Sequence, residues 1–412
     1  MTSPEPYWHA TRGSPAVPAG EPPRVCDVAV VGGGWLGAAT AYWLARAGAR
    51  VVLLESVHPA AGATGRNGGF MVAGTAEPYD QAMARVGREA ARAVWELTLE
   101  NRSLLREVLA REEIDCEYRE PGHLALALGA AQGAALRRTV AALRADGFAA
   151  EWLDRAQTQA LVGTPLGPAI DGALYAPEDG LLHPVRLVVG LLGAAARHGA
   201  TVVAGAPVRR IEAGAGGVQV ATDRGTTAAG AAVVAVNAWT DELVPDLAGV
   251  ITPVRGQALA YAPLAPTFGP GMGAAVTPTG EYWHQTPDGS VVIGGCRATA
   301  PDYDVGVREA VPTAEVQAAI EHVLPRLFPA LGGLRVARRW AGLMAFTSDY
   351  LPVADAAPGL PGVWVVGGFC GHGMPFGLVL GRLLAEAALG GARPPALHPL
   401  RLGRPTLRRE AA

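Results

Sequence analysis

Three glycines near the amino terminus have the spacing of a dinucleotide-binding turn. Gly32, Gly34 and Gly37 follow the apolar run 25–31 and precede a stretch of helical composition, 38–47. In such a turn the first glycine permits a tight bend, the second lets the backbone approach a pyrophosphate, and the third lets a helix pack closely on a strand. The helix that follows points free N–H groups at the phosphates. This spacing therefore indicates binding of a dinucleotide cofactor.

An acidic residue distinguishes between the kinds of dinucleotide. Glu55 closes the next apolar run, 51–54. At the end of the second strand a carboxylate can accept hydrogen bonds from ribose hydroxyls. The same carboxylate would repel a 2′-phosphate, so we expect FAD or NAD rather than NADP.

A second glycine-rich loop, 62–69, favours FAD over NAD. It reads Gly-Ala-Thr-Gly-Arg-Asn-Gly-Gly and lies just past Glu55, where it could close over the pyrophosphate and ribityl chain. Thr64 and Asn67 can supply polar contacts, and Arg66 can supply a charge that compensates the phosphates. A flexible surface loop is the alternative, but it would leave the Arg-Asn pair beside a phosphate site unexplained.

The elements that must position these residues follow two patterns. Strand–turn–helix units of the nucleotide-binding type open and close the chain, and mixed strands and helices lie between them. This predicts an α/β fold, in which a discontinuous Rossmann-like FAD-binding domain carries an inserted mixed-sheet α+β substrate domain. We expect the FAD-binding domain at 25–115, 180–250 and 336–392, the substrate domain at 116–179 and 251–335, an N-terminal extension at 1–24, and a poorly ordered tail at 393–412.

Apolar spacing predicts two helices in the middle of the chain. One long helix is expected over 79–113. Another is expected over 313–324, with Thr313 as its N-cap and Pro325 just past its end. The uncharged stretches 28–45 and 356–381 could mimic membrane spans, but both contain many glycines and read better as strand–turn–helix units.

Composition excludes several classes of function. The formal net charge of −3 gives no basic surface, so we expect no nucleic-acid partner. The four cysteines form no CxxC pair, which argues against a zinc site or a disulfide framework and is typical of a cytoplasmic protein. All 34 basic residues are arginine. No lysine can therefore act as a Schiff base, a general base or an oxygen-activating cation.

The two glycine loops belong to a larger set of motifs that is typical of one enzyme superfamily. The chain resembles the D-amino-acid-oxidase-like flavoenzymes, which include glycine oxidase and the sarcosine oxidases. Within them it is most similar to gamma-glutamylputrescine oxidoreductase and its relatives. The further residues that carry the resemblance are Tyr7-Trp8, Cys26-Asp27-Val28, Leu182-His183-Pro184, Asn237-Ala238-Trp239, 282–289, Arg339-Trp340-Ala341-Gly342 and 368–373.

The resemblance implies an FAD enzyme that oxidises a small amine or amino acid and passes electrons to oxygen or another acceptor. The glycine-rich uncharged stretches argue against a membrane span and leave peripheral membrane association open. Val208 would meet the adenine through its backbone. The turn 371–374 would open the last helix and direct N–H groups at the flavin's pyrimidine edge. The implied FAD-binding residues are Gly32, Gly34, Trp35, Gly37, Glu55, Ser56, Thr64, Gly65, Arg66, Asn67, Gly68, Gly69, Val208, Asn237, Trp239, Gly342, Gly371, His372, Gly373 and Met374.

Two departures from the sarcosine-oxidase pattern affect the expected chemistry. The segment 342–347 lacks the cysteine that bonds to flavin in those enzymes, so we expect non-covalent FAD and interpret Cys370 as a small loop residue. Met374-Pro375 stands where they use a lysine to hold the substrate carboxylate, which favours an amine or an amino acid whose carboxylate lies elsewhere. His372 or His284 could supply the positive charge that a lysine gives those oxidases near the flavin.

Catalysis needs little acid–base help if a neutral amine gives its α-hydrogen to flavin N5 and the imine then hydrolyses. The site must mainly exclude water and lower the pKa of the amine, for which aromatic walls suffice. The candidate catalytic residues are Tyr282, His284, Trp340 and His372, with Phe70 and Trp283 as further aromatic walls and His183 as a structural residue.

Two alternative functions share the first fingerprint. An NAD-dependent dehydrogenase would use Gly32 to Glu55 but would leave the loop 62–69 unexplained. A flavin-binding protein without turnover would use both loops and would not reduce its flavin with any amine.

Overall fold

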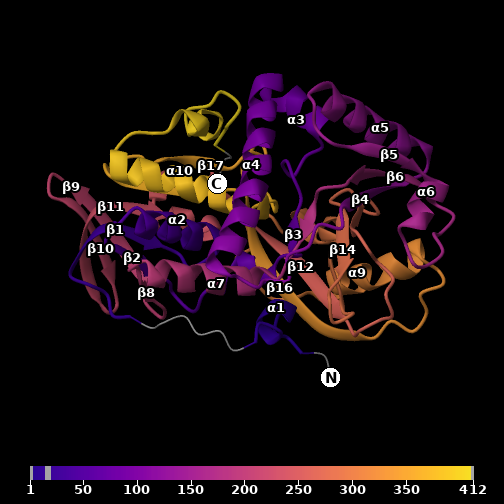
Figure 1. The fold of residues 1–412 in the computed structure, drawn as a ribbon, viewed down its shortest axis with the longest axis horizontal. Coiled ribbons are helices and arrows are strands. Elements are labelled where there is room, and N and C mark those ends of the chain that lie inside the picture. The colour runs from indigo at the N-terminus through magenta and orange to yellow at the C-terminus, as the bar shows by residue number, and fades with distance from the viewer. Residues whose placement is uncertain (1–2, 14–19, 410–412) are drawn as a thin grey trace.

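A largely parallel sheet forms one half of the computed structural model, which describes residues 3–13 and 20–409 (Figure 1). Strands β18, β11, β1, β2 and β8 run parallel, β17 pairs antiparallel with β18, and the hairpin β9–β10 extends β11. In order across the sheet the strands are β17 (Val353–Ala356), β18 (Val363–Gly367), β11 (Gly225–Val234), β1 (Val25–Val31), β2 (Val51–Leu54) and β8 (Thr201–Val203), with β10 (Gly217–Thr222) and β9 (Val208–Gly214) beside β11.

Both faces of this first sheet are buried, which is why its central strands are continuously apolar. Val28 and Val30 of β1 pack in one core cluster with three helices, and Ala29 and Val31 pack in the cluster on the other face. The three helices are α2 (Trp35–Arg46), α7 (Pro184–Arg197) and α10 (Gly377–Gly390). The predicted Rossmann-like α/β unit is confirmed.

The second sheet forms the other half of the molecule and is mainly antiparallel. Within the described residues only its β13–β4 pair runs parallel. In order the strands are β16 (Val336–Phe346), β12 (Thr252–Tyr261), β15 (Val291–Gly295), β14 (Glu281–Gln285), β13 (Gly271–Ala274), β4 (His123–Leu128), β6 (Ile170–Ala176) and β5 (Glu151–Asp154). Its helices are α5 (Ala130–Ala145), α6 (Arg155–Ala160) and α9 (Ala314–Leu327).

Side-chain alternation in the second sheet positions the site. Leu124 and Trp283 face the core cluster that includes α9. Their neighbours His123, Tyr282 and His284 therefore point to the opposite face, toward the short strand pair β3 (Phe70–Met71) and β7 (Gly180–Leu181).

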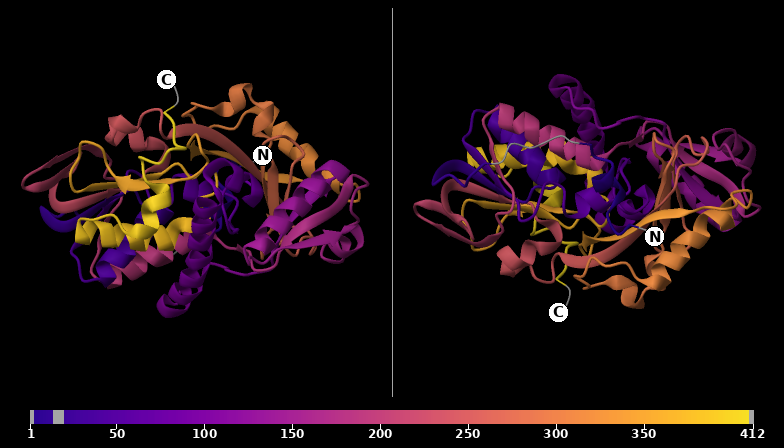
Figure 2. Two further views of the ribbon diagram at one scale, coloured as in Figure 1. Left: turned by 90° about the horizontal axis from the view of Figure 1, so that it is seen from above. Right: turned by 90° about the horizontal axis from the view of Figure 1, so that it is seen from below.

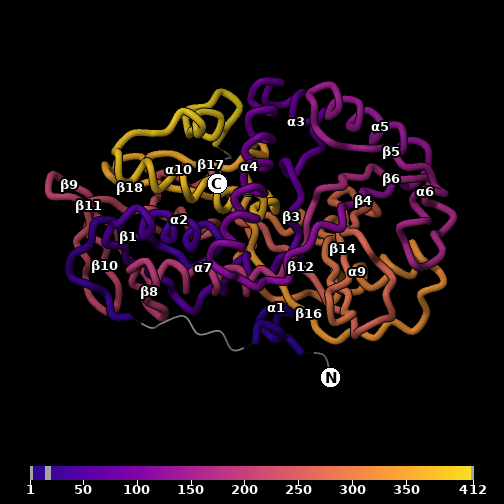
Figure 3. The backbone as a smooth tube through the Cα atoms, in the orientation of Figure 1, coloured from indigo at the N-terminus to yellow at the C-terminus, as the bar shows by residue number. Residues whose placement is uncertain are grey.

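Each half is assembled from distant parts of the sequence. In Figures 2 and 3 the half with the parallel sheet contains indigo, red and yellow segments, and the other half contains purple and orange ones. Strand β16 pairs along its length with β12, so 336–346 lies in the second sheet although we expected it in the FAD-binding domain. An apolar strand does not by itself specify which sheet it joins. The other domain boundaries remain proposals.

The expected long helix 79–113 is two helices, α3 (Tyr79–Val86) and α4 (Arg88–Glu112). Gly87 separates them with φ +86° and ψ 151°, a conformation that is open to glycine but not to residues with a side chain. The expected end of α9 was also wrong, because Pro325 lies inside that helix. Thr313 precedes α9 without a capping bond, and its hydroxyl accepts from the Gln257 amide instead (2.9 Å).

The carboxyl-terminal tail is ordered, contrary to the expectation for 393–412. A 3₁₀ segment, Pro395–Leu400, buries Leu397 and Leu400. Beyond it Arg404 forms a buried ion pair with Asp349 (Nε–Oδ2 2.6 Å) and donates to the carbonyl of Leu351 (2.8 Å). The expected poor order was wrong for 393–409, because the pairing of Arg404 with Asp349 joins distant residues and is not visible in sequence. Residues 410–412, like 1–2 and 14–19 of the N-terminal extension, lie outside the described residues.

The remaining α-helices are short. They are α1 (Tyr7–Ala10) and α8 (Thr240–Leu243). Among the described residues no helix is both long and apolar enough to cross a membrane. The stretches 28–45 and 356–381 are strand–turn–helix units, as predicted.

Candidate active site

The first glycine loop holds the start of α2 against the ends of β1 and β2. A Cβ at Gly37 would lie 1.8 Å from the carbonyl oxygen of Gly32, so only glycine fits there. The Glu55 carboxylate turns back to the loop and accepts hydrogen bonds from the N–H groups of Gly33 (2.6 Å) and Val57 (2.8 Å). The loop is thus fixed by close packing and by a buried acid.

The second glycine loop folds over the amino terminus of α2. It contains a 3₁₀ turn, Ala63–Arg66, in which the Thr64 hydroxyl accepts from the N–H of Trp35 (3.0 Å). Asn67 closes the loop on itself, because its amide donates to the Thr64 carbonyl (3.0 Å) and its oxygen accepts from the N–H of Gly69 (2.7 Å). Both predicted loops therefore meet at one end of the parallel sheet.

Three ring side chains from distant segments hold the second loop from outside. The Trp8 indole donates to the Asn67 carbonyl (2.7 Å), and the Trp340 indole donates to the Arg66 carbonyl (2.9 Å). His284 Nε2 lies 2.8 Å from the Gly68 carbonyl and must donate to it. The sequence does not predict this contact of Trp8, because no local pattern shows which distant loop its side chain will contact.

These residues fit FAD. At Gly34 the Thr64 hydroxyl is the one atom within 4 Å of where a Cβ would be (3.2 Å), so the backbone there is open to a ligand. The N–H groups at the start of α2 can face phosphate oxygens, and the Glu55 carboxylate, which also accepts from the Ser56 hydroxyl (3.1 Å), lies at the ribose end. Trp239 lies beside Gly62, because a Cβ added at Gly62 would lie 3.6 Å from Cζ3 of the Trp239 ring.

The other expected FAD-binding residues differ in where they lie relative to the two glycine loops. Val208 is the first residue of β9. It follows Ala206 by two residues, and the Ala206 N–H donates to the Glu55 carbonyl (2.9 Å). Gly342 packs against Arg66, because a Cβ added at Gly342 would lie 2.9 Å from the Cβ of Arg66. Gly65 faces the other way, because a Cβ there would lie 2.2 Å from His9 Nε2 of α1. It spaces the loop from the amino-terminal segment.

The turn 371–374 does not open the last helix directly. A 3₁₀ turn, Met374–Phe376, intervenes and α10 begins at Gly377. The turn is fixed from two sides, since the Trp35 indole donates to the Met374 carbonyl (2.9 Å) and the Asn237 oxygen accepts from the N–H of Gly368 (3.1 Å). It lies between α2 and the second sheet, where Met344 of β16 faces Gly371.

Two expected catalytic residues, Trp340 and His284, are buried against the second glycine loop. Protein atoms bury Trp340 and His284 to 1% and 2% exposure, and both side chains bond to the second loop. Trp283, expected as an aromatic wall, is in the core of the second sheet. Closeness to a motif led to these assignments, whereas strand alternation and loop contacts decide which way each side chain points.

Four other side chains form a wall beside the second loop. Phe70 makes edge contacts with the rings of Tyr282 (5.7 Å) and His123 (5.8 Å). Tyr282 also lies against Gly68, 2.6 Å from where its Cβ would be. His372 joins from the 371–374 turn, with Nε2 3.0 Å from the Val72 carbonyl. We call Phe70, His123, Tyr282 and His372 the substrate wall.

His123 is the member of the substrate wall that sequence reasoning missed. It is the first residue of β4, and neither of its ring nitrogens has a hydrogen-bond partner among the described residues. The Tyr282 hydroxyl is likewise without one in the described part of the chain. The only signal was a histidine at the head of an otherwise apolar strand, which occurs equally in structural roles.

The substrate wall carries no positive charge at neutral pH. Burial lowers the pKa of His372, and burial followed by the charge of Arg119 lowers the pKa of His284 to about 4. Burial, with a smaller effect of His372, lowers the pKa of His123 to about 4. These lowered pKa values disfavour a cation at His372 or His284, and the expectation that one of them supplies a positive charge stays a prediction. Arg66 does carry a charge in the loop itself, where it donates to the Ala341 carbonyl (2.7 Å).

Comparison with known proteins decides the family. The model of the family DAO, FAD dependent oxidoreductase, matches residues 27–387. The chain belongs to this family. It is an FAD-dependent oxidoreductase, and the expected cofactor is confirmed.

Relatives of this FAD-dependent oxidoreductase match most of its length. A probable oxidoreductase OrdL of Rhizobium meliloti (strain 1021) is 29% identical over 374 residues, covering 89% of this chain and 84% of the relative. Gamma-glutamylputrescine oxidoreductase of Escherichia coli (strain K12) is 28% identical over 381 residues with the same coverage. The crystal structure of glycine oxidase from Geobacillus kaustophilus is 25% identical, has a TM-score of 0.79, and covers 93% of this chain and 99% of that one.

Proposed function

We propose that this enzyme oxidatively deaminates a primary or secondary amine, or an amino acid whose carboxylate is held away from the 371–374 turn. The observation that carries the proposal is the substrate wall, which sets uncharged polar groups beside the cofactor loop. Apolar rings with neutral nitrogen and hydroxyl groups suit a neutral amine better than an anion or a cation.

The substrate wall prepares the amine by removing water. Phe70 and Tyr282 shield the site, and a desolvated amine has a lowered pKa, so its neutral form with a free lone pair predominates. With a pKa of about 4, His123 is neutral at physiological pH. One ring nitrogen can therefore accept a hydrogen bond from the substrate N–H and fix the direction of the α-carbon hydrogen.

Bound FAD would supply the hydride acceptor for this oxidation. As the α-hydrogen leaves with its electron pair, the nitrogen lone pair forms the C=N π bond of an iminium ion, and loss of one N–H proton to water gives the neutral imine. Water then adds to the C=N carbon, and the products are a carbonyl compound and ammonia or an amine.

The substrate class rests on relatives and on one absence. Glycine oxidase and gamma-glutamylputrescine oxidoreductase are named for amino-acid and amine substrates. This chain has no lysine to hold an α-carboxylate after the glycine–histidine–glycine turn, where Met374 and Pro375 stand. An amine is therefore the first choice.

An anaerobic screen tests the proposal. Holoenzyme is mixed with polyamines, monoamines, sarcosine, glycine and D-amino acids, and the flavin absorbance is followed before air is admitted. We expect an amine to bleach the flavin, and the rate at which colour returns will distinguish an oxidase from a dehydrogenase. If no member of the panel bleaches the flavin, the proposal is wrong and a flavoprotein with another electron donor is indicated.

A further inference from the structure

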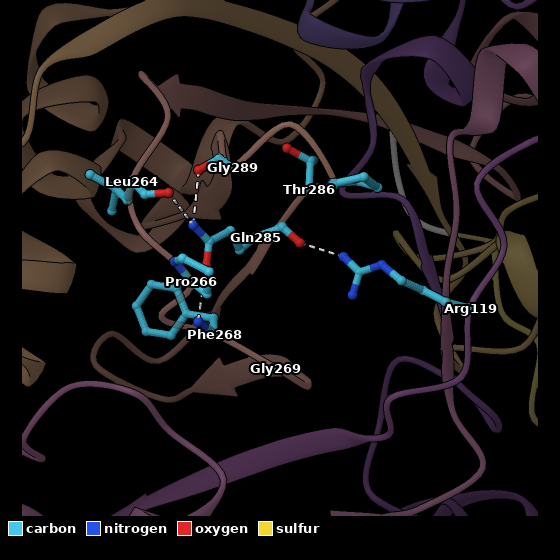
Figure 4. Close-up of a pocket in the computed structure, with 9 residues that line it drawn as sticks. Arg119, Leu264, Pro266, Phe268, Gly269, Gln285, Thr286 and Gly289 are labelled. Atoms are coloured by element: carbon cyan, nitrogen blue, oxygen red, sulfur yellow. Dashed lines mark hydrogen bonds between the residues drawn. The ribbon is translucent and has the colours of Figure 1, made fainter.

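A separate pocket of about 320 Å³ opens at the end of β14, where Gln285 is the last residue of that strand (Figure 4). Its floor and sides are apolar or backbone, from Leu264, Pro266, Phe268 and Pro287. Across from them Arg119 extends its guanidinium to the carbonyl of Gln285, as Figure 4 shows. None of the residues expected to bind cofactor or substrate lines this pocket.

Arg119 is short of partners for a half-buried cation. Its guanidinium makes one hydrogen bond and no ion pair within the described residues. Burial lowers its pKa, which reflects hydration lost without replacement by a carboxylate. An arginine side chain has several N–H donors in a planar fork, so Arg119, which lines the pocket, keeps donors that can bind a ligand.

The neighbouring acids are committed elsewhere. Glu117 pairs with Arg186 (2.8 Å). Asp288 accepts from the Tyr7 hydroxyl (2.9 Å) and from the N–H of Ser290 (3.0 Å). Neither carboxylate therefore completes the coordination of Arg119.

The other polar side chains that line the pocket, Thr286 and Gln285, are bonded within the protein, and the Thr286 hydroxyl donates to the Ser290 carbonyl (2.9 Å). The Gln285 amide lines the pocket, but its oxygen accepts from the N–H groups of Thr267 (2.7 Å) and Phe268 (3.2 Å), and its nitrogen donates to the Leu264 carbonyl (3.1 Å). This network fixes the wall and leaves the amide without free valence for a ligand. A guanidinium fork above apolar walls is the arrangement that binds a carboxylate attached to an apolar chain.

We propose that the Arg119 pocket binds the carboxylate of a small acid with an apolar chain. Such a carboxylate could be the far end of the substrate or could belong to a separate acid. The two sources share the same contacts. Strand β14 connects the pocket to the second glycine loop, because Gln285 lines the pocket and the adjacent His284 bonds to the Gly68 carbonyl.

Binding to the holoenzyme tests the pocket without requiring turnover. Isothermal titration calorimetry is run with hexanoate, and with hexan-1-ol as the uncharged probe, on wild type, Arg119→Gln and the control Arg138→Gln, which removes an exposed arginine from α5. We expect hexanoate to bind wild type and the control equally and to bind Arg119→Gln about tenfold or more weakly. Hexan-1-ol should not distinguish the three proteins. Absent binding at millimolar hexanoate, or equal affinity for Arg119→Gln, overturns the proposal, provided flavin content and melting temperature show that the variant is folded.

Kinetics then separate the two sources of the carboxylate. Hexylamine and 6-aminohexanoate are compared as flavin reductants. If the pocket holds the substrate's own far end, Arg119→Gln raises KM for 6-aminohexanoate and leaves hexylamine unchanged. If it holds a separate acid, both amines behave alike in the two proteins and hexanoate still binds with the amine present. Failure of both amines to reduce the flavin would contradict the proposed function and leave the calorimetric result standing.

Discussion

Glu55 and Asp349, two buried acids of the half built on the parallel sheet, have their carboxylates paired with protein donors, whereas three polar side chains near the site in the half built on the second sheet lack protein partners within the described residues. In the first half the Glu55 carboxylate accepts from Gly33 and Val57, and Arg404 pairs with Asp349. In the second half the His123 ring, the Tyr282 hydroxyl and most of the Arg119 guanidinium have no partner within the described residues. Saturated groups fix a shape, and unsatisfied ones cost stability unless a ligand meets them. The paired groups of the first half therefore hold a fixed shape for the cofactor, and the unpaired groups of the second half can bind a ligand.

The largest effect is expected from Gly37→Ala, which tests the fixed shape of the cofactor half. The added methyl would lie 1.8 Å from the Gly32 carbonyl, so the loop must move. We expect a loss of about 3 kcal/mol or more of folding free energy and a protein purified without FAD, measured by its flavin-to-protein absorbance ratio. Gly193→Ala in α7 is the control, because the nearest atom is Arg197 Nη1 at 3.9 Å, and it should be neutral or stabilising by up to about 1 kcal/mol. A yellow, stable Gly37→Ala protein would contradict the close-packing argument.

Arg404→Met contrasts a saturated arginine with an unsatisfied one. Removing Arg404 strands the buried Asp349 and should cost about 3–5 kcal/mol in urea unfolding, whereas Arg119→Met should cost nothing or stabilise. The exposed pair Arg209–Asp223 is the control, with about 0–1 kcal/mol for Arg209→Met. Equal costs for Arg404 and Arg119 would remove the distinction between the two halves.

The same ion pair has a defined pH dependence. Burial would raise the pKa of Asp349, but the hydrogen bonds and charge of Arg404 outweigh it and hold that pKa below its usual value. The contribution of the pair is therefore complete above the unfolded pKa of about 3.9 and is lost as the pH falls through the lower folded value. Wild type and Arg404→Met should converge in stability in that acidic range.

His123→Phe tests whether an unsatisfied group in the second half acts on the substrate. The ring packing against Phe70 is kept and the hydrogen-bond acceptor is lost, so flavin content and melting temperature should not change. Anaerobic flavin reduction by the best amine should slow by about 10²-fold in stopped-flow measurements. His123→Gln restores an acceptor and should recover part of the rate. If His123→Phe reacts at the wild-type rate, His123 is only a packing residue.

The smallest expected effect is on pH dependence between pH 6 and 9. His123 and His284 have pKa values of about 4 and are neutral throughout this range. The reduction rate should therefore rise with pH only as the substrate amine loses its proton, and an amine of lower pKa should shift the whole profile downward. A common inflection near pH 6.5 for every amine would show a titrating histidine and would contradict the neutral substrate wall.

The cofactor half was predictable because its motifs act locally. Gly32, Gly37 and Glu55 lie within one strand–turn–helix–strand unit, where the spacing along the sequence determines which residues contact each other. Strands 25–31 and 51–54 match β1 and β2 at both ends. The helix begins three residues earlier than expected, at Trp35, which is a matter of capping.

The substrate half was not predictable, because its contacts join distant strands. Trp340 and His284 stand in recognisable motifs, yet both support the second loop from behind. His123 stands in no motif and faces Phe70 across the site. Only the pairing order β14–β13–β4 brings these residues together, and no local pattern in the sequence encodes that order.

The hydrogen bond from the Trp35 indole to the Met374 carbonyl has a consequence for how the enzyme comes into being. Trp35 is synthesised long before Met374, and strand β18 and helix α10 are also made after α2 and β2. A nascent chain that has already formed β1, α2 and β2 still lacks the wall and turn that complete the cofactor site. We therefore expect FAD to be captured after synthesis ends, so that cellular flavin supply affects the finished protein and not its translation.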